Sequence, residues 1–360
     1  MKKIAFFGGD ISHTGGTERV SLALANYLVK DGYQVVIISL SGNTPPKFYA
    51  DERIKLVSLF DEKRRFSFAY FSVVFRLRRI LIDESIDILI DVDTMLALFS
   101  TTSLLGTKVK HISWEHFNYK NNLTIKSRKL ARKVAAKYAD AVVTLTKKDR
   151  DYWLEENRYP EKIISIPNPL PFEPLHKLAI KKTKTVLALG RLNHIKGFDL
   201  LINIWARVEE NCPDWKLIIA GDGEEQQFLL DKIRELNLKN IKLLPTTLNV
   251  VELYNQSEIY VMTSRFEGFG MVLIEAKACG LPIIAYDCDT GPSELIIDNE
   301  DGYLVPFDDS DMFVERLILL INNENLREAM SMKSLENAGQ YRIESTIGNK
   351  WKNLIENINK

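Results

Sequence analysis

Residues 264–285 read SRFEGFGMVLIEAKACGLPIIA, and this stretch, together with the strand before it, decides the fold. The apolar run Ile259–Met262 predicts a strand, and the run Ile283–Ala285 begins the next one. Between them we expect a helix from Gly270 through Cys279, with Gly280 at the position that follows it. The pattern is therefore a strand, a glycine-rich loop, a helix and a second strand.

The start of this helix is a candidate site for a diphosphate. Amide groups in the first turn of a helix have no partner within the helix, and the helix dipole adds partial positive charge there. A glycine-rich turn also lets bare backbone approach a ligand closely. The N–H groups expected to hold the diphosphate are those of Gly270, Met271, Val272 and Leu273, and Gly268 and Phe269 are expected to bind the donor as part of the turn.

Two carboxylates, Glu267 and Glu275, stand on either side of that helix start. Carboxylates accept hydrogen bonds from hydroxyl groups and strengthen them with their charge. Glu275 is therefore a candidate for binding a ribose diol, and Glu267 for binding sugar hydroxyls. The alternative is that Glu267 is a first-turn helix acid and Glu275 a surface residue.

The string from Ser264 to Pro282 resembles the signature of the family-4 retaining glycosyltransferases (glycosyl transferases group 1), which have the GT-B fold. The resemblance implies an α/β protein of two Rossmann-like domains, each a doubly wound parallel sheet, that face each other across a cleft. It assigns residues 1–170 to an acceptor domain and residues 171–342 to a nucleotide-sugar donor domain. Residues 343–360 are expected to cross back to the first domain as a helix. The apolar stripe of that helix consists of Ile347, Trp351, Leu354 and Ile358.

The beginning of the chain also reads as a doubly wound sheet. Lys3–Phe7 predicts a strand, Glu18–Asp31 an amphipathic helix and Gln34–Leu40 the next strand. The pair Gly15 and Gly16 lies just before that helix, and relatives carry a similar GG-T/A-E-R string where backbone approaches the donor phosphates and the acceptor. A merely flexible loop is the alternative.

A second diphosphate-binding loop is expected after the strand Thr185–Leu189. The string Gly190-Arg191-Leu192, followed by Lys196-Gly197, resembles the loop with which the family neutralises the leaving diphosphate. Arg191 offers a planar fork and Lys196 a point charge. Two solvated surface cations are the alternative. Relatives have a glycine after the strand Ile241–Leu244, where this chain has Pro245, and that departure leaves the base of the nucleotide open.

His116 is a candidate catalytic and acceptor-binding residue, and Glu115 a candidate acceptor-binding residue. Both follow the predicted strand Lys110–Trp114, at the end of the sheet where parallel folds place ligands, and relatives have a His in the same place. The Asp91-Val92-Asp93 triplet imitates a metal-binding DxD motif. We interpret it as a strand terminus, because GT-B enzymes do not depend on a bound metal, and we expect no metal site and no cofactor beyond the nucleotide-sugar co-substrate.

Composition excludes several classes of protein. Three scattered cysteines, Cys212, Cys279 and Cys288, have no metal or disulfide spacing and favour a reducing, cytoplasmic compartment. The chain shows no signal h-region and no run of about 18 apolar residues. Residues 1–170 hold 27 Lys and Arg against 19 Asp and Glu, whereas residues 171–360 hold 21 against 29. A basic half indicates an anionic partner, or a chance surface composition.

The stretch at residues 62–82, EKRRFSFAYFSVVFRLRRILI, interleaves arginines with aromatic residues. It suits a basic amphipathic helix on an anionic membrane, at the inner face of the cell membrane, or equally an ordinary core helix with solvated arginines. The five arginines are Arg64, Arg65, Arg76, Arg78 and Arg79. The resemblance favours the membrane, because many relatives use lipid-linked acceptors.

The function implied is metal-independent transfer, with retention of configuration, of a hexose or N-acetylhexosamine from a nucleotide-diphosphate sugar to a saccharide or lipid-linked acceptor. In the relatives the leaving diphosphate takes the proton of the acceptor. UDP is favoured over GDP by likeness to bacterial polysaccharide enzymes, and no nucleic acid is involved. Two alternatives are a non-catalytic GT-B subunit that binds a glycan and a GT-B sugar-nucleotide epimerase. A non-catalytic subunit would be expected to lose Arg191, Lys196, Glu267 and Glu275, which are all present.

Overall fold

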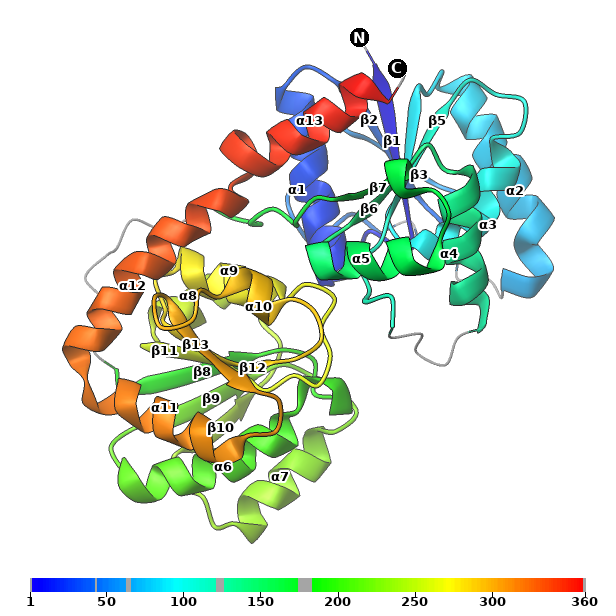
Figure 1. Cartoon of the computed structure of the whole chain (residues 1–360). Coiled ribbons are helices and arrows are strands. Elements are labelled where there is room, and N and C mark those ends of the chain that lie inside the picture. Colours follow the sequence, from blue (N-terminus) through cyan, green and yellow to red (C-terminus); the bar gives the residue numbers. More distant parts are fainter. Residues whose placement is uncertain (1, 43, 63–65, 121–125, 174–182, 359–360) are drawn as a thin grey trace. The chain divides into compact units, whose positions relative to one another are not determined.

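The computed structural model describes residues 2–42, 44–62, 66–120, 126–173 and 183–358, with the side chains of 66–69 left out. Contacts divide the chain into two compact units (Figure 1). The N-terminal unit comprises Met1–Pro171 with Tyr341–Lys360, and the C-terminal unit comprises Phe172–Gln340. The sequence placed these boundaries at 170/171 and 342/343. Arg64 and Arg65 lie outside the described residues.

The N-terminal unit is built on a seven-stranded sheet in the order β3-β2-β1-β4-β5-β6-β7, and every neighbouring pair is parallel. Its strands are runs of buried apolar residues, as both faces of a parallel sheet are covered. They are β1 (Lys3–Gly8), β2 (Gln34–Ser39), β3 (Lys55–Ser58), β4 (Ile88–Asp91), β5 (Lys110–Trp114), β6 (Ala141–Thr144) and β7 (Ile163–Ser165).

Helices cover both faces of this sheet. The strand order runs outward from β1 to β3 and then returns to β4. Right-handed crossovers therefore place the first helix on one face of the sheet and the helices that follow it on the other (Figure 1). The helical elements are α1 (Gly16–Lys30), α2 (Phe66–Asp83), η1 (Thr94–Leu96), α3 (Ala97–Ser103), α4 (Lys126–Tyr138), α5 (Lys147–Glu156) and η2 (Pro160–Lys162).

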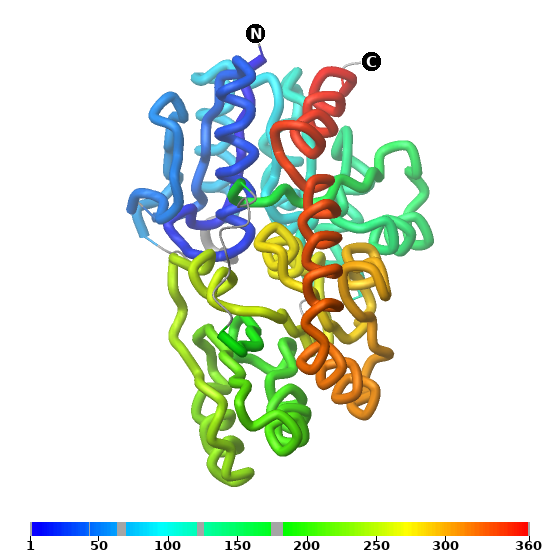
Figure 2. Tube along the Cα trace, turned by 90° about the vertical axis from the view of Figure 1, so that its left-hand side faces the viewer, coloured from blue at the N-terminus to red at the C-terminus, as the bar shows by residue number. Residues whose placement is uncertain are grey.

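The end of the chain belongs to the N-terminal unit. After a π-helical turn, Ile343–Ile347, helix α13 (Gly348–Asn357) lies alongside α1 (Figure 2). Its Trp351 is fully buried and meets the ring of Trp114 with the ring centres 4.7 Å apart. This confirms the expected crossover helix. The buried stripe differs from the expected one, because Ile355 is buried whereas Leu354 and Ile358 are only half-buried.

The C-terminal unit has a six-stranded parallel sheet in the order β10-β9-β8-β11-β12-β13. Its strands are β8 (Thr185–Leu189), β9 (Lys216–Ala220), β10 (Ile241–Leu244), β11 (Ile259–Met262), β12 (Ile283–Asp287) and β13 (Gly302–Pro306). Its helical elements are η3 (His194–Lys196), α6 (Phe198–Asn211), α7 (Gln226–Glu235), α8 (Val250–Asn255), α9 (Met271–Ala278), α10 (Pro292–Leu295), α11 (Ser310–Asn322) and α12 (Glu324–Ala338). A short η4 (Gly339–Tyr341) leads to the N-terminal unit.

Both units are therefore doubly wound parallel sheets, as the sequence predicted. In each, two adjacent central strands are followed by loops that lead away in opposite directions, and the carboxyl ends of such strands are where these folds bind ligands. The pairs are β1 with β4 and β8 with β11. Among the described residues, no helix combines the length and apolar character that crossing a membrane requires.

Candidate functional site

The two loops expected to bind a diphosphate start from neighbouring strands. β8 and β11 pair directly, so the loop after β8 and the loop after β11 meet at one edge of the sheet. The close approach depends on Gly197, which has φ +64°, and a Cβ there would overlap the carbonyl oxygen of Thr263. The Thr263 hydroxyl also donates to the Gly197 carbonyl at 2.9 Å. Topology thus brings Lys196 and Glu267 together.

Lys196 and Glu267 form an ion pair. The Lys196 Nζ donates to Glu267 Oε1 at 2.6 Å, and the Ser264 hydroxyl donates to the same oxygen at 2.7 Å. The Glu267 side chain is only 8% exposed and that of Lys196 is 23% exposed. A buried carboxylate needs such partners, because an unpaired buried charge is strongly unfavourable. Both groups are thereby fixed at the carboxyl edge of the sheet.

The glycine-rich turn after Glu267 is held by a second loop. The Thr290 hydroxyl donates to the Glu267 carbonyl at 2.6 Å. Gly270 has φ +94° and occupies the N-cap of α9, a backbone conformation that residues with a side chain rarely adopt. The Leu273 amide donates to the Gly270 carbonyl at 2.9 Å, so it does not face a ligand, contrary to expectation. The amides of the first turn that remain for an anion are those of Gly270, Met271 and Val272.

Glu275 is not a surface residue. It lies on α9 with 6% of its surface exposed, and its Oε2 accepts a hydrogen bond from the Tyr254 hydroxyl at 3.0 Å. Burial, with the Glu275 charge as the next cause, raises the pKa of Tyr254 well above its ordinary value, so the tyrosine stays a donor. Tyr254 therefore orients the carboxylate beside the start of α9.

Arg191 differs from Lys196 in its surroundings. Its guanidinium meets Glu224 at 3.2 Å, and the two side chains are 70% and 60% exposed. An exposed pair of this kind is weak and leaves the side chain able to change partner. Gly190 precedes Arg191 at the end of β8, and the Lys196 side chain packs against that glycine.

Pro245, which stands where relatives have a glycine, is followed by Thr246. The Thr246 amide donates to Asp222 at 3.2 Å on an exposed surface.

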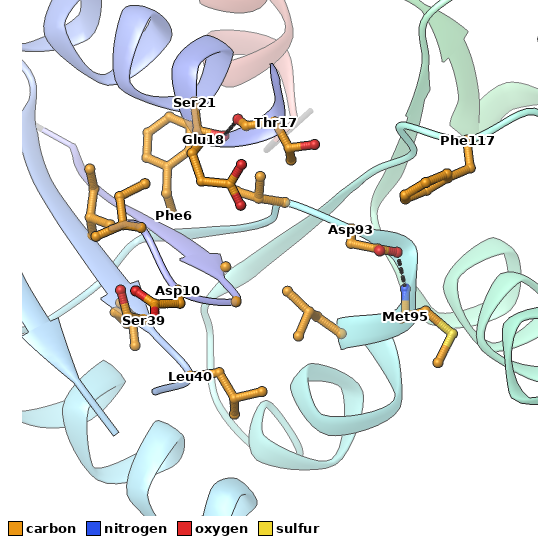
Figure 3. Close-up of a pocket in the computed structure, with 17 residues that line it drawn as sticks. Phe6, Asp10, Thr17, Glu18, Ser21, Ser39, Leu40, Asp93, Met95 and Phe117 are labelled. Atoms are coloured by element: carbon orange, nitrogen blue, oxygen red, sulfur yellow. Dashed lines mark hydrogen bonds between the residues drawn. The ribbon is translucent and has the colours of Figure 1, made fainter. Parts of the chain in front are cut away.

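The N-terminal unit has a cavity of about 380 Å³ at the carboxyl ends of β1, β2 and β4 (Figure 3). Apolar side chains make up much of its lining, among them Phe6, Met95 and Phe117. Polar lining comes from the loop after β1, from the first turns of α1, from the end of β2 and from the loop after β4. These polar residues are Asp10, Thr17, Glu18, Ser21, Ser39 and Asp93.

Gly15 and Gly16 directly precede Thr17 and Glu18, which line this cavity. Gly15 is the N-cap of α1, Gly16 is its first residue, and both are exposed. The Glu18 carboxylate lies against Gly15, where a Cβ would overlap it. The glycine therefore leaves room for the glutamate.

His116 follows β5 and stacks on Trp114, with the ring centres 4.6 Å apart. Its Nε2 is enclosed and has no hydrogen-bond partner among the described residues. Burial lowers the pKa of His116 from 6.5 to about 3, so the ring is neutral at pH 7. A neutral ring with an unpartnered nitrogen can accept or donate one hydrogen bond.

Glu115 takes a structural part rather than the expected acceptor contact. Its carboxylate is 1% exposed and accepts from Arg132 Nε at 2.7 Å. The amides of His116 and Phe117 also donate to it, at 3.1 and 3.0 Å. Its oxygens are thus engaged within the loop, and Glu115 positions His116 through the backbone.

The two aspartates at the carboxyl end of β4, Asp91 in the strand and Asp93 just beyond it, also make structural contacts. Asp91 is fully buried and meets the His111 ring at 2.7 Å and the Ser100 hydroxyl at 2.5 Å. Asp93 accepts from the Met95 amide at 2.8 Å and pairs with Arg128 at 3.1 Å. They point to different partners, which agrees with their interpretation as strand-end residues. Within the described ranges, no cluster of three or more metal-ligating side chains is found.

Helix α2 occupies most of the basic aromatic stretch. Arg76 donates to the Leu59 carbonyl at 2.7 Å, and Arg78 to the Ser103 and Leu105 carbonyls at 2.9 and 2.6 Å, so these cations brace neighbouring loops. Arg79 is exposed and pairs only loosely with Asp83, at 3.4 Å. Among the described side chains of α2, three large apolar ones are also exposed: Phe71, Phe75 and Ile82.

Sequence reasoning missed several of these residues. Ser264 precedes Glu267 by three positions, a local spacing that signals a contact. Tyr254 and Ser39 carry no such signal, since each reaches its place from a different strand or helix.

Known proteins resemble this chain along its whole length. The family profile described as "Glycosyl transferases group 1" matches residues 174–336, and that described as "Glycosyltransferase Family 4" matches residues 14–173. An uncharacterized glycosyltransferase of Haemophilus influenzae is 39% identical over 99% of this chain and 100% of its own length. The amylovoran biosynthesis glycosyltransferase AmsD of Erwinia amylovora is 31% identical, over 99% and 100%.

A further relative acts on a lipid-linked glycan. It is an α-1,4-N-acetyl-D-galactosaminyltransferase of Campylobacter jejuni, named for a substrate joined to diphospho-undecaprenol, and is 30% identical over 99% of both chains. Among solved structures, S. aureus TarM has a TM-score of 0.83 at 18% identity and covers 100% of both chains. HepE of Anabaena has a TM-score of 0.80 at 18% identity, over 99% of this chain and 100% of its own. These structures share the fold.

Proposed function

The chain belongs to glycosyltransferase family 4, and from that premise we propose that it transfers a hexose or N-acetylhexosamine from UDP to a glycan acceptor with retention of configuration. The observation that carries the proposal is the pairing of Lys196 with Glu267 beside the start of α9. One group is a cation suited to a diphosphate, and the other a carboxylate suited to sugar hydroxyls. An ion pair kept only for stability would not need a glycine-rich helix start beside it.

The C-terminal unit supplies the donor contacts. The amides of Gly270, Met271 and Val272 and the charge of Lys196 suit the diphosphate, and Glu275, held by Tyr254, suits the ribose diol. As the bond between the sugar and the diphosphate breaks, negative charge grows on the leaving oxygen. Donors fixed in advance around that oxygen lower the barrier most. Arg191, which has only an exposed partner, can turn to the diphosphate when the donor binds.

Transfer with retention requires the acceptor oxygen to approach from the side on which the diphosphate leaves. The acceptor hydroxyl forms its bond to the anomeric carbon and passes its proton to the departing diphosphate, so no enzyme base takes that proton. We assign the acceptor to the cavity of the N-terminal unit. His116, which is neutral and whose Nε2 has no partner in the described part of the chain, is proposed to hold a hydroxyl of the reacting sugars by one hydrogen bond.

UDP is proposed as the nucleotide because the solved structures of similar fold include complexes with it. TarM was solved with UDP and a GlcNAc-glycerol, and HepE with UDP. The relatives AmsD and the Campylobacter transferase are named for polysaccharide and lipid-linked glycan synthesis. A lipid-linked acceptor would bring the enzyme to a membrane, and we propose that the exposed face of α2, with Phe71, Phe75 and Arg79, meets an anionic surface.

The test combines binding and turnover. UDP-sugars should raise the melting temperature of the full chain by mass action, and GDP-sugars should not. A Glu275→Gln variant should lose stabilisation by UDP and by UDP-sugars alike, while the exposed control Glu235→Gln should keep both. Stabilisation by GDP-sugars alone would refute UDP. Turnover of the donor to an epimer without any acceptor would favour the epimerase alternative, and binding without turnover would favour the non-catalytic one.

A further inference from the structure

The lining of the cavity in the N-terminal unit indicates which class of acceptor it takes. The cavity lies where β1 and β4 run side by side and their loops part, the place at which doubly wound sheets bind ligands (Figure 3). Its volume of about 380 Å³ falls in the range of small-molecule sites, roughly 300–1,000 Å³.

Two polar groups in this cavity have no hydrogen-bond partner among the described residues. Ser39 is 5% exposed, and its hydroxyl makes no hydrogen bond to any described residue. Glu18 lies at the first turn of α1, and its carboxylate forms neither an ion pair nor a hydrogen bond within the described part of the chain. A buried hydroxyl such as that of Ser39 normally has a partner, and the half-buried Glu18 carboxylate lines the same cavity, so both groups are suited to a ligand.

The charge of the lining is negative. Three carboxylates contribute to it, those of Asp10, Glu18 and Asp93, and the described lining contains no Lys, Arg or His. Arg128 neutralises Asp93 from outside the lining, and Asp10 accepts from the Ser12 amide and hydroxyl. Glu18 therefore has no counter-ion among the described side chains, and the start of α1, where it lies, adds only partial positive charge. Such a cavity favours hydroxyl and amide donors and disfavours an anion, which would enter without a counter-charge.

A lipid chain suits this lining less well than a sugar. Phe6, Met95 and Phe117 would accept methylene groups, but the Glu18 carboxylate and the Ser39 hydroxyl would then be buried against hydrocarbon. A pyranose ring satisfies both parts of the lining. Its C–H face packs on apolar side chains, and its hydroxyls bond to Glu18 and Ser39.

We propose that this cavity binds the uncharged terminal sugar of the acceptor, a neutral hexose or N-acetylhexosamine, and rejects acceptors that end in a uronic acid or a phosphorylated sugar. The proposal rests on the proposed function, because it names the acceptor class for that reaction. It makes Glu18 the residue that determines specificity for neutral over anionic sugars.

The experiment uses the full chain without donor. Saturation-transfer NMR titrations compare methyl N-acetylglucosaminide and methyl galactoside with methyl glucuronide and glucose 6-phosphate. Neutral glycosides should bind in the millimolar range, and the anionic ones at least about 10-fold more weakly. Ser39→Ala should weaken neutral binding about 5-fold, the effect of one hydrogen bond.

Variants at Glu18 test the charge directly. Glu18→Gln should bring neutral and anionic sugars to within about threefold of each other, and Glu18→Lys should make the anionic sugars the better ligands. Glu161→Gln, an exposed acid on η2, is the control and should keep the discrimination of the wild type. A merely structural role of Glu18 would weaken all sugars equally and overturn the proposal.

The remaining outcomes separate this proposal from the proposed function. No binding of any glycoside overturns the proposal. The proposal is also overturned if the protein binds dodecyl maltoside but not maltose and Glu18→Lys leaves that binding unchanged. Such a result would indicate that the cavity binds a lipid chain. Donor binding and turnover are measured in the same samples. If UDP-sugars neither bind nor turn over while Glu18 still controls sugar discrimination, the proposed function fails and the neutral-sugar site stands.

Discussion

Replacing Lys196 with methionine should lower both stability and transfer, whereas replacing Arg191 should lower transfer alone. The two cations occupy one loop and are proposed to serve one diphosphate. They differ in burial, because Lys196 is 23% exposed and bonded to a buried carboxylate, and Arg191 is 70% exposed with an exposed partner. Lys196 and Ser264 both donate a hydrogen bond to Glu267 Oε1. Lys196→Met removes the charged donor of these two and leaves the Ser264 hydroxyl.

The size of the effect follows from the geometry. At 2.6 Å the attraction between the two charges is roughly 6 kcal/mol with an effective dielectric constant of about 20. Desolvation offsets much of it, and breaking a fully buried pair costs about 3–5 kcal/mol. Because Lys196 is partly exposed, we expect a loss of about 2–3 kcal/mol, or a fall in melting temperature of about 4–12 °C for a unit of this size. Arg191→Met should change stability by less than about 0.5 kcal/mol.

A double-mutant cycle with Glu267→Gln checks the reasoning. Glutamine keeps the hydrogen-bonding oxygen and removes the charge, so Lys196→Met should cost less in the Glu267→Gln background than in the wild type, by about 1 kcal/mol or more. Urea denaturation at pH 7 and transfer assays on all four proteins provide the measurements. Both cation variants should slow transfer about 10²–10³-fold. A Lys196→Met protein as stable as the wild type, or additive effects in the cycle, would refute the pair as drawn.

Three further outcomes are expected. The pKa of His116 is about 3 in the folded protein and 6.5 in the unfolded chain. The stability that the neutral ring contributes is therefore full above pH 6.5 and is lost at up to about 1.4 kcal/mol per pH unit as pH falls from 6.5 toward 3. Between pH 7 and pH 5, urea denaturation should show a smaller loss of stability in His116→Phe than in the wild type, and an equal loss would contradict the burial of His116. Transfer should survive EDTA, because the two aspartates at the end of β4, Asp91 and Asp93, are bonded to protein groups. Abolition of transfer by EDTA, with rescue by manganese or magnesium, would show a metal site. The protein should sediment with anionic vesicles and be released by salt, and Phe71→Ser with Phe75→Ser and Arg79→Glu should weaken this; equal binding to neutral vesicles would exclude the proposed face of α2.

The sequence predicted best where local chemistry decides the structure. α9 spans Met271–Ala278, its N-cap is Gly270 and Gly280 follows with φ +73°, close to the expected helix. Glycine before and after an apolar run acts within a few residues, so no knowledge of the rest of the chain is required. The doubly wound sheets were predicted for the same reason, because the alternation of strands and helices can also be read locally.

Contacts between distant segments were harder to predict. Lys196 and Glu267 meet because β8 pairs with β11, and strand order is not encoded near either residue. Glu115 was expected to contact the acceptor because the sequence near it does not show which side chain it meets. Its partner Arg132 lies on α4, and only the packing of that helix shows that the carboxylate is buried.

The ion pair also changes what is expected of Glu267. From the sequence alone, removing this carboxylate should leave UDP binding unchanged. In the structure Glu267 holds Lys196, the cation that the diphosphate needs, so UDP must compete with Glu267 for it. UDP alone offers Glu267 no hydroxyl of a donor sugar in return.

Glu267→Gln should therefore tighten UDP binding by about 3- to 10-fold, the equivalent of a partly exposed ion pair, while lowering transfer because the sugar contact is lost. The intact donor compensates both groups, as its diphosphate takes Lys196 and its hydroxyls take Glu267. Calorimetry with UDP and with the donor decides this, and Glu275→Gln, which should weaken both ligands alike, is the matched control. Weaker UDP binding in Glu267→Gln than in the wild type would mean that the carboxylate itself contacts the nucleotide, and the assignment of the two glutamates would have to be exchanged.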